Sequence, residues 1–302
     1  MRTARFGTVV TAMVTPMNGG GEVDLDETKR LARWLCDHGS GGLVVSGTTG
    51  EGPTLSEYEK LALFSAVVDG VRGRAKVIAN TGGNDTRTSV ELTRKAAACG
   101  VDGILAVGPY YNKPPQAGLI AHFTAMADAV DLPVMIYNIP GRTAVNVLPD
   151  TLVELSAHPR IVAVKESSGD LMQIAEICAR VPADFDVYSG DDHLALPVAA
   201  VGGVGVVSVA SHVAGDDIKS MLDAHFAGEV EKAAQIHQRL LPLIRGLFAV
   251  TSPIPVKAAV ARFGFSVGRC RLPLCELTPE QQRSLDAAIA PWLRSLAAAP
   301  AR

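Results

Sequence analysis

The sequence lacks the spacings that hold metal ions or build a disulfide framework. Its five cysteines are scattered without a CxxC pair, and its seven histidines are dispersed, with no HExxH segment and no carboxylate-rich cluster. Metal-dependent catalysis therefore lacks its usual ligands, and we expect no metal site. Scattered cysteines are typical of a reducing compartment, which leads us to expect a cytoplasmic protein.

Basic clusters and membrane-spanning segments are missing as well. The net charge is -3 and no run of lysine or arginine could neutralise phosphates or dock on anionic lipid, so we expect neither nucleic acid nor membrane as a partner. The first 16 residues include an apolar run, but threonines interrupt it and no small-residue cleavage site follows, which favours a strand over a signal peptide. Residues 194–211 carry no charge, yet Pro197 and three glycines favour a helix followed by a buried strand over a membrane span.

The sequence does contain a repeating alternation of short β-branched runs and amphipathic stretches. Hydrophobic residues make up 48% of the chain, which indicates a well-filled interior. Eight runs are candidate strands: residues 8–14, 43–46, 76–79, 103–107, 133–137, 161–164, 186–188 and 204–209. Stretches with helical spacing lie between them: residues 26–38, 56–70, 86–99, 116–129, 149–157 and 171–180. A strand–loop–helix unit that recurs about every 30 residues predicts a parallel sheet.

Eight such units predict an α/β protein with a closed (β/α)8 TIM barrel. The rival fold, an open doubly wound sheet, usually has fewer strands and a glycine-rich first turn, which is absent here. Ser56 and Glu59 have the spacing of a capping box at a helix start. Glycines mark three expected helix ends: Gly39, Gly70 and Gly100. We predict a barrel of residues 1–225 followed by a small C-terminal helical domain of residues 226–302.

One lysine lies at the end of the sixth predicted strand, in the segment IVAVKES at residues 161–167. Side chains alternate between the two faces of a strand, so Ala163, Lys165 and Ser167 share one face. If that face is the barrel interior, burial favours the neutral amine, which is a nucleophile able to condense with a carbonyl. The alternative is a strand-end lysine whose ammonium group reaches solvent at the rim.

Candidate binding residues follow the second and fourth predicted strands, because the active site of such a barrel lies at the carboxyl ends of its strands. The segment GTTGE at residues 47–51 allows a sharp turn in which amide groups and the hydroxyls of Thr48 and Thr49 face a small anion such as a carboxylate. An ordinary turn rich in glycine and threonine is the alternative. Tyr110 and Tyr111 follow the fourth strand, where surface packing or a subunit contact is the ordinary explanation.

The fifth and seventh predicted strands end in further polar groups. The segment YNIPGRT at residues 137–143 places the phenol of Tyr137 at the barrel mouth and the guanidinium group of Arg142 further out, where it could clamp a carboxylate. The segment SGDD at residues 189–192 would repel the phosphate that many barrels hold at this corner. A lysine, a tyrosine, hydroxyls and an arginine at one mouth therefore indicate carbonyl chemistry through an imine.

Five segments spread over nearly the whole chain together resemble the dihydrodipicolinate synthase (4-hydroxy-tetrahydrodipicolinate synthase) family: residues 47–51, 110–114, 137–143, 164–166 and 253–257. The lysine and the GTTGE turn would also suit the wider pyruvate-dependent class I aldolase superfamily, which includes N-acetylneuraminate lyase. The paired threonines, Thr48 and Thr49, and the GRT that follows Tyr137 point to the synthase.

The resemblance implies condensation of pyruvate with L-aspartate 4-semialdehyde, on the way to diaminopimelate and lysine. It implies that Lys165 forms a Schiff base with pyruvate and that no cofactor is needed. Thr48 and Thr49 would hold the pyruvate carboxylate, and Tyr137, Thr48 and Tyr111 would relay protons.

The same resemblance implies residues around the second substrate and a subunit contact. Arg142 would bind the carboxylate of the semialdehyde, and the backbone near Gly190 and Val207 would line the pocket. In this family the tyrosine that matches Tyr111 is lent by a neighbouring subunit, which implies a homo-oligomer, usually a dimer of dimers.

This chain departs from the relatives that lysine inhibits. Those carry histidine and glutamate at a site between subunits, where this chain has Glu57, Lys60 and Thr88, beside Asn84 and Tyr110. Lys60 would repel the ammonium groups of lysine, and Thr88 offers no opposite charge. We predict weak or absent feedback inhibition by lysine.

Two other functions remain open from the residues alone. One is another pyruvate-dependent lyase or dehydratase with the same lysine, of the N-acetylneuraminate or keto-deoxy-sugar type. The other is a catalytically silent barrel that acts as an interaction protein, which would require the loss of a catalytic group. The lysine, the tyrosines and the threonines are all present, so the synthase is favoured.

Overall fold

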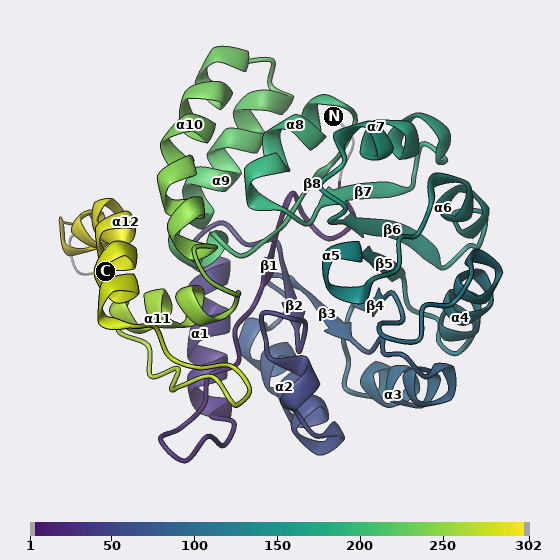
Figure 1. Ribbon diagram of the computed structural model, residues 1–302, viewed down its shortest axis with the longest axis horizontal. Helices are drawn as coiled ribbons and strands as arrows, with labels where there is room; N and C mark the ends of the chain where they lie inside the picture. The colour runs from purple at the N-terminus through teal and green to yellow at the C-terminus, as the bar shows by residue number, and fades with distance from the viewer. Residues whose placement is uncertain (1–3, 299–302) are drawn as a thin grey trace.

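The computed structural model describes residues 4–298 of the chain, with side chains up to residue 294. Its centre is a closed barrel of parallel strands that follow one another in sequence order (Figure 1). The strands are β1 (Val9–Ala12), β2 (Gly42–Val45), β3 (Lys76–Asn80), β4 (Gly103–Val107), β5 (Val134–Asn138), β6 (Ile161–Glu166), β7 (Asp186–Ser189) and β8 (Gly205–Ser208). The barrel closes by pairing of β1 with β8, in which Val10 lies opposite Val207. The predicted (β/α)8 barrel is confirmed.

Helices surround the barrel and cover its outer face (Figure 1). They are α1 (Leu25–Asp37), α2 (Glu57–Val71), α3 (Thr86–Ala98), α4 (Gln116–Asp128), α5 (Pro140–Thr143), α6 (Pro149–Leu155), α7 (Leu171–Arg180), α8 (Ala195–Ala200), α9 (Ser211–Phe226), α10 (Val230–Leu247), α11 (Ile254–Arg262) and α12 (Pro279–Ala298). Two 3-10 turns, η1 (Gly52–Thr54) and η2 (Asp192–Leu194), follow β2 and β7. Each predicted helix is present with its ends shifted by two residues or fewer, whereas the short α5 was not predicted.

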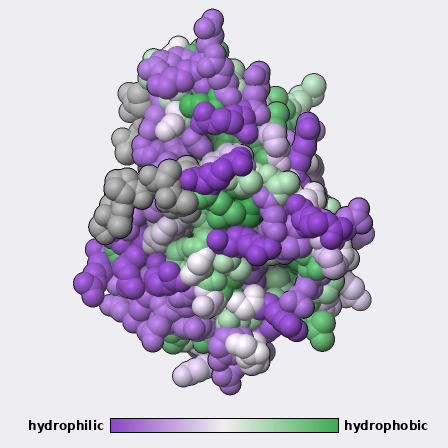
Figure 2. All heavy atoms as spheres, turned by 90° about the vertical axis from the view of Figure 1, so that its left-hand side faces the viewer, coloured by the Kyte–Doolittle hydropathy of each residue, from purple (hydrophilic) through white to green (hydrophobic). Residues whose placement is uncertain are grey.

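The last three helices, α10 to α12, lie together on one side of the barrel (Figure 1). The helix α9 packs against both β1 and α10 and so joins the barrel to this group. Where described, the surface on this side is mostly hydrophilic (Figure 2), while apolar residues of α10 such as Leu240 and Leu243 are buried. The predicted boundary between residues 225 and 226 falls at the end of α9, and the division into two domains stays a prediction.

Helix ends follow the chemistry of their caps with one exception. Ser56 and Glu59 form the predicted capping box at the start of α2, and Gly39 and Gly100 follow their helices in the left-handed conformation. The prediction that a helix ends at Gly70 was wrong, because α2 continues to Val71. A Cβ atom at position 70 would lie 3.2 Å from the Cα of Lys29, so this glycine lets α1 and α2 pack closely.

Hydrophobic side chains form two layers on either side of the barrel wall. One layer fills the barrel and the other packs between strands and helices, so that along β6 Ala163 faces inward and Val164 outward. Phe6, which precedes β1, belongs to the inner layer and contacts Gly103 at the start of β4, so its ring closes the amino end of the barrel. The carboxyl end remains for polar side chains. In the described part of the chain no helix is both long enough and apolar enough to cross a bilayer.

Candidate active site

Lys165 points into the barrel, on the same face of β6 as Ala163. Only 5% of the residue is exposed. Tyr137 on β5 and Tyr188 on β7 are its neighbours in the sheet. Its amine, Nζ, lies 4.0 Å from the centre of the Tyr137 ring, a cation–π distance. The lysine is therefore interior and does not extend to the rim, which decides between the two positions that the strand pattern left open.

The amine of Lys165 is free of the ion pair that fixes the other buried lysine. Lys257 is paired with Glu51 at 2.6 Å, whereas Lys165 forms no ion pair with any carboxylate of residues 4–294. Burial raises the pKa of Asp191, and the nearby positive charges of His193 and Lys165 partly oppose this effect. An amine without a bound carboxylate is available for attack on a carbonyl.

Gly190 packs directly against the lysine side chain. A Cβ atom at this position would lie 3.0 Å from Cε of Lys165 and 1.8 Å from Oγ of Ser167, so no side chain fits there. The hydroxyl of Ser167 is buried and has no hydrogen-bond partner among the described side chains and backbone. Gly190 therefore leaves room for the side chains of Lys165 and Ser167.

A cavity of about 260 Å³ lies at the carboxyl end of the barrel. Lys165 is not among its lining residues, but Tyr137, which packs on the lysine amine, is. Three predicted site residues, Thr48, Tyr137 and Arg142, line it together. Its other lining residues are Gly47, Gly52, Pro53, Lys60, Asn80, Gly82, Val107, Tyr110, Ile139 and Thr143. The ring of Tyr137 thus contacts the Lys165 amine and also forms part of the cavity wall.

Arg142 reaches the cavity from the short helix α5. This helix begins at Pro140 and ends before Ala144, which has a left-handed φ of 59°. The Arg142 side chain donates a hydrogen bond to the backbone oxygen of Ser252 at 3.2 Å, which leaves the rest of its guanidinium group for a ligand.

A buried polar cluster behind the barrel wall holds the segment that carries Arg142. Glu166, next to Lys165 but on the outer face of β6, accepts hydrogen bonds from Asn138 at 2.9 Å and from the backbone of Ser168 at 2.7 Å. The Asn138 side chain also accepts from the backbone of Val147 at 2.9 Å. Burial raises the pKa of Glu166, and these donors oppose the rise.

The turn at residues 47–52 is compact and presents only one of its two threonines to the cavity. Thr48 lines the cavity, whereas Thr49 is 5% exposed and does not. The side chain of Thr15 donates a hydrogen bond to the backbone oxygen of Gly50 at 2.7 Å. A Cβ atom at Gly52 would lie 2.2 Å from the backbone oxygen of Ser46, so the turn requires glycine there.

The remaining predicted site residues, Val207 and Tyr111, do not line the cavity. Val207 is part of the inner hydrophobic layer together with Tyr137. Tyr111 is 89% exposed, with a left-handed φ of 76°, and does not line the cavity, although the adjacent Tyr110 does. A single chain therefore does not bring Tyr111 to Lys165.

The corner after β7 and β8, where many barrels bind phosphate, is filled by the chain itself. Asp192 is buried and accepts hydrogen bonds from the backbone of Val209 at 3.0 Å and of Ala210 at 3.1 Å, at the start of α9. Ser208 donates a third bond to it. This carboxylate occupies the donors that a phosphate would use, in agreement with the expectation that phosphate is disfavoured here.

Two features of the site were missed from the sequence. Lys60, which was placed only at a contact between subunits, lines the same cavity as Tyr137. The contact between Lys257 and Glu51 joins two segments that had each been noted but not connected.

No group of three or more His, Cys, Asp or Glu residues suited to a metal ion occurs in the described part of the chain.

The sequence as a whole matches known proteins over most of its length. It matches the Dihydrodipicolinate synthetase family over residues 5–291. The chain belongs to this family. A 4-hydroxy-tetrahydrodipicolinate synthase from Halalkalibacterium halodurans is 53% identical over 286 residues, which cover 95% of this chain and 97% of the relative.

Solved structures of the dihydrodipicolinate synthetase family share the fold. A dihydrodipicolinate synthase from Bacillus anthracis has a TM-score of 0.93 and 47% identity, covering 96% of this chain and 99% of that one. A relative from Cyanidioschyzon merolae, solved with lysine bound, has a TM-score of 0.92 and 47% identity, covering 94% of this chain and 97% of that one. The family resemblance suggested by the five sequence segments is therefore confirmed.

Proposed function

We propose that this chain catalyses the condensation of pyruvate with L-aspartate 4-semialdehyde to 4-hydroxy-tetrahydrodipicolinate, in the pathway to diaminopimelate and lysine. One observation carries the proposal: the buried Lys165 amine lies 4.0 Å from the ring of Tyr137, a residue that lines a cavity at the carboxyl end of the barrel. Relatives 53% identical to this chain are named for that activity.

In the first half-reaction the amine of Lys165 attacks the ketone carbon of pyruvate, and water leaves as the imine forms. The hydroxyl of Thr48 and the backbone amide groups of the turn, including that of Thr49, hold the pyruvate carboxylate. The imine nitrogen then gains a proton and the methyl group loses one, which gives the enamine. Because the imine forms with the substrate itself, the reaction needs no external cofactor.

In the second half-reaction the enamine carbon attacks the aldehyde. The amino group of the semialdehyde then displaces the Lys165 amine from the imine carbon, which closes the ring and frees the enzyme. A proton relay must supply the new hydroxyl group. Tyr137 and Thr48 line the same cavity and act in this relay, together with Tyr111. Arg142 binds the carboxylate of the semialdehyde, and the backbone near Gly190 and Val207 shapes the pocket.

Tyr111 supports a proposal about assembly. An aromatic residue that is 89% exposed, in a left-handed conformation, suits insertion into a neighbouring subunit better than a free surface. We propose that Tyr111 completes the proton relay of a partner subunit in a homo-oligomer, a dimer of dimers. The cytoplasmic location expected from the cysteines stays part of the proposal.

Reduction with borohydride in the presence of pyruvate tests the chemistry. The imine becomes a stable secondary amine, and peptide mapping should place the added mass on Lys165 and leave the ion-paired Lys257 unmodified. Samples without pyruvate or without borohydride are the controls. Failure to trap pyruvate on Lys165 in active enzyme would refute the imine mechanism.

A coupled assay then identifies the second substrate. We expect turnover with aspartate semialdehyde and none with N-acetylneuraminate or keto-deoxy sugars. Trapping of pyruvate together with cleavage of a sugar acid would instead assign the chain to another branch of the superfamily.

A further inference from the structure

Glu51, at the end of the GTTGE turn, has a buried carboxylate held by two groups from far along the chain. The residue is 2% exposed. Its Oε1 accepts a hydrogen bond from Nζ of Lys257 at 2.6 Å, and its Oε2 accepts one from the backbone N–H of Arg271 at 2.7 Å. Lys257, also 2% exposed, donates a further bond to the backbone oxygen of Arg269 at 2.9 Å. Hydrogen bonds from the C-terminal region to this one carboxylate therefore hold the turn in place.

The backbone at Glu51 closes the turn that carries Thr48. The N–H of Glu51 donates to the oxygen of Thr48 at 3.1 Å, and the N–H of Gly52 donates to the oxygen of Gly47 at 3.0 Å. Glu51 itself is left-handed, with φ of 56°. A residue with a side chain occupies this region at a cost of about 1 kcal/mol, so surrounding contacts must hold it there.

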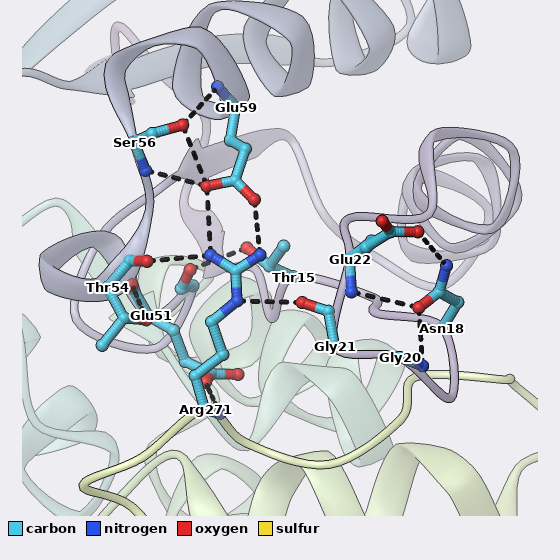
Figure 3. Close-up of polar contacts among 11 residues, drawn as sticks. Thr15, Asn18, Gly20, Gly21, Glu22, Glu51, Thr54, Ser56, Glu59 and Arg271 are labelled. Carbon is cyan, nitrogen blue, oxygen red and sulfur yellow. Dashed lines mark hydrogen bonds and ion pairs between the residues drawn. The ribbon is translucent and has the colours of Figure 1, made fainter.

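Arg271 holds the segment that follows the turn (Figure 3). Its side chain donates to the backbone oxygens of Thr54 at 2.8 Å and Gly21 at 2.9 Å, and forms an ion pair with Glu59. Glu59 is the capping-box residue of α2, and the guanidinium group lowers its pKa to about 2. The turn is thus fixed from the C-terminal region at both Glu51 and the start of α2.

The side of the turn before Glu51 has contacts of another kind. There Thr15 holds the backbone of Gly50, and the Asn80 side chain donates to the backbone oxygen of Ser46 at 3.1 Å. These are single hydrogen bonds between neutral groups. At Glu51, by contrast, the carboxylate forms an ion pair, and among residues 4–294 Lys257 is the one charged side chain in that pair.

From this geometry we propose that Lys257 is a positioning residue, whose ion pair with Glu51 holds Thr48 and its turn in the shape that binds the pyruvate carboxylate. The inference rests on the proposed function, because it requires that the turn bind pyruvate. Lys257 does not line the cavity with Tyr137 and Arg142, so it acts through Glu51 and not on the substrate.

A purely structural ion pair is the competing explanation, and its consequences differ. Buried ion pairs often add little net stability, because desolvation of both charges offsets their attraction. A structural pair would change the melting temperature when broken and leave the kinetic constants of the remaining folded enzyme unchanged. A positioning pair would also change KM for pyruvate, since a shift of about 1 Å at a binding group can cost 100-fold in rate.

The test compares Lys257→Met with a variant that loses stability elsewhere. Ile177→Ala removes a fully buried side chain from α7, which packs against α6 and α8, and serves as the matched control. Both variants are assayed as full-length enzyme, well below their melting temperatures. We expect KM for pyruvate to rise about tenfold or more in Lys257→Met and to stay within twofold of wild type in Ile177→Ala. An unchanged KM in Lys257→Met, or an equal rise in both, overturns the proposal.

The double variant Glu51→Gln/Lys257→Met keeps the proposal falsifiable if the single variant does not fold. It replaces both charges with neutral groups, so no carboxylate is left buried without a partner. We expect it to fold and still to show the raised KM, because the tie between the turn and α11 is gone. A folded double variant with the wild-type KM overturns the inference.

Borohydride trapping separates this inference from the proposed function. Wild-type enzyme should be trapped by pyruvate on Lys165, and Lys257→Met should be trapped on the same residue at saturating pyruvate. Absence of trapping in the wild type overturns the function. Normal trapping in the wild type with an unchanged KM in Lys257→Met overturns only the positioning role.

Discussion

The amine of Lys165 lies 4.0 Å from the centre of the Tyr137 ring, on the neighbouring strand of the barrel. The two residues pair directly across β5 and β6, so the sheet itself sets their distance. The aromatic face and the phenol group of Tyr137 therefore have separable roles: one packs on the amine, the other is available for proton transfer.

Tyr137→Phe should separate these two roles. It keeps the ring against the amine and removes the hydroxyl group, so we expect pyruvate still to be trapped on Lys165. Turnover should fall by about 100- to 10,000-fold, the usual contribution of a general acid or base. Burst trapping and steady-state kcat are the two measurements. Equal loss of trapping and turnover would contradict a proton-relay role.

Arg142→Ala should affect the second substrate alone. A charge-assisted hydrogen bond contributes about 1.5 to 3 kcal/mol, so KM for aspartate semialdehyde should rise by about 10- to 100-fold. KM for pyruvate should stay near the wild-type value, because that carboxylate is held at Thr48. A larger rise in KM for pyruvate than for the semialdehyde would show that Arg142 binds the pyruvate carboxylate instead.

The positions of Lys165 and Arg142 could be predicted from the sequence to different degrees. The period-two alternation of β6 puts Lys165 on the same face as Ala163, which is a local property readable from the sequence, whereas closure of the barrel decides that this face is the interior. The helix α5, which carries Arg142, has four residues, which is too short for a helical repeat of apolar residues to be recognised in the sequence.

Contacts between distant segments were not predictable from the same information. Glu51 and Lys257 are 206 residues apart, and each looks like an ordinary charged residue in its own segment. Only the closed barrel and the position of α11 bring them together. Gly70 is a similar case, because a glycine that ends a helix and a glycine that lets two helices approach look alike in sequence.

Feedback inhibition by lysine should be weak or absent. Lys60 lines the cavity, and Glu57, an acidic residue beside it, is already paired with Lys95 at 2.5 Å. An ammonium group of bound lysine would be repelled by Lys60, and the Glu57 carboxylate would not attract it because it is already paired with Lys95. We expect sub-millimolar lysine to leave the activity unchanged, and half-maximal inhibition in that range would contradict the prediction.

A gain-of-function variant sharpens this prediction. Lys60→His/Thr88→Glu removes the repelling charge and adds a carboxylate, so it should acquire measurable inhibition by lysine. The single change Lys60→Met is the control, because it removes the charge without supplying an acceptor. Similar responses of the two variants would show that repulsion by Lys60 is not what excludes lysine.

Stability should fall with acid because of His212, a fully buried residue at the start of α9. Its Nε2 accepts a hydrogen bond from the backbone N–H of Val14 at 3.1 Å, and its Nδ1 donates to the oxygen of Val209 at 2.9 Å. Because a backbone N–H only donates and a carbonyl only accepts, the ring is neutral with its proton on Nδ1. Burial lowers the pKa of His212 from 6.5 to about 4.

The sign of the pH effect follows from this lowered pKa. Between pH 6.5 and about 4 the unfolded chain binds a proton at this histidine and the folded chain does not. The stabilisation is complete above pH 6.5 and is lost as the pH falls toward the folded pKa, at about 1.4 kcal/mol per pH unit. The free energy of unfolding, measured with urea at a series of pH values, should depend less steeply on pH between 6.5 and about 4 in His212→Gln than in wild type, by this amount. His225→Gln, on the same helix but only partly buried, is the control and should keep the wild-type slope. Equal slopes in wild type and His212→Gln would mean that another group is responsible for the acid sensitivity.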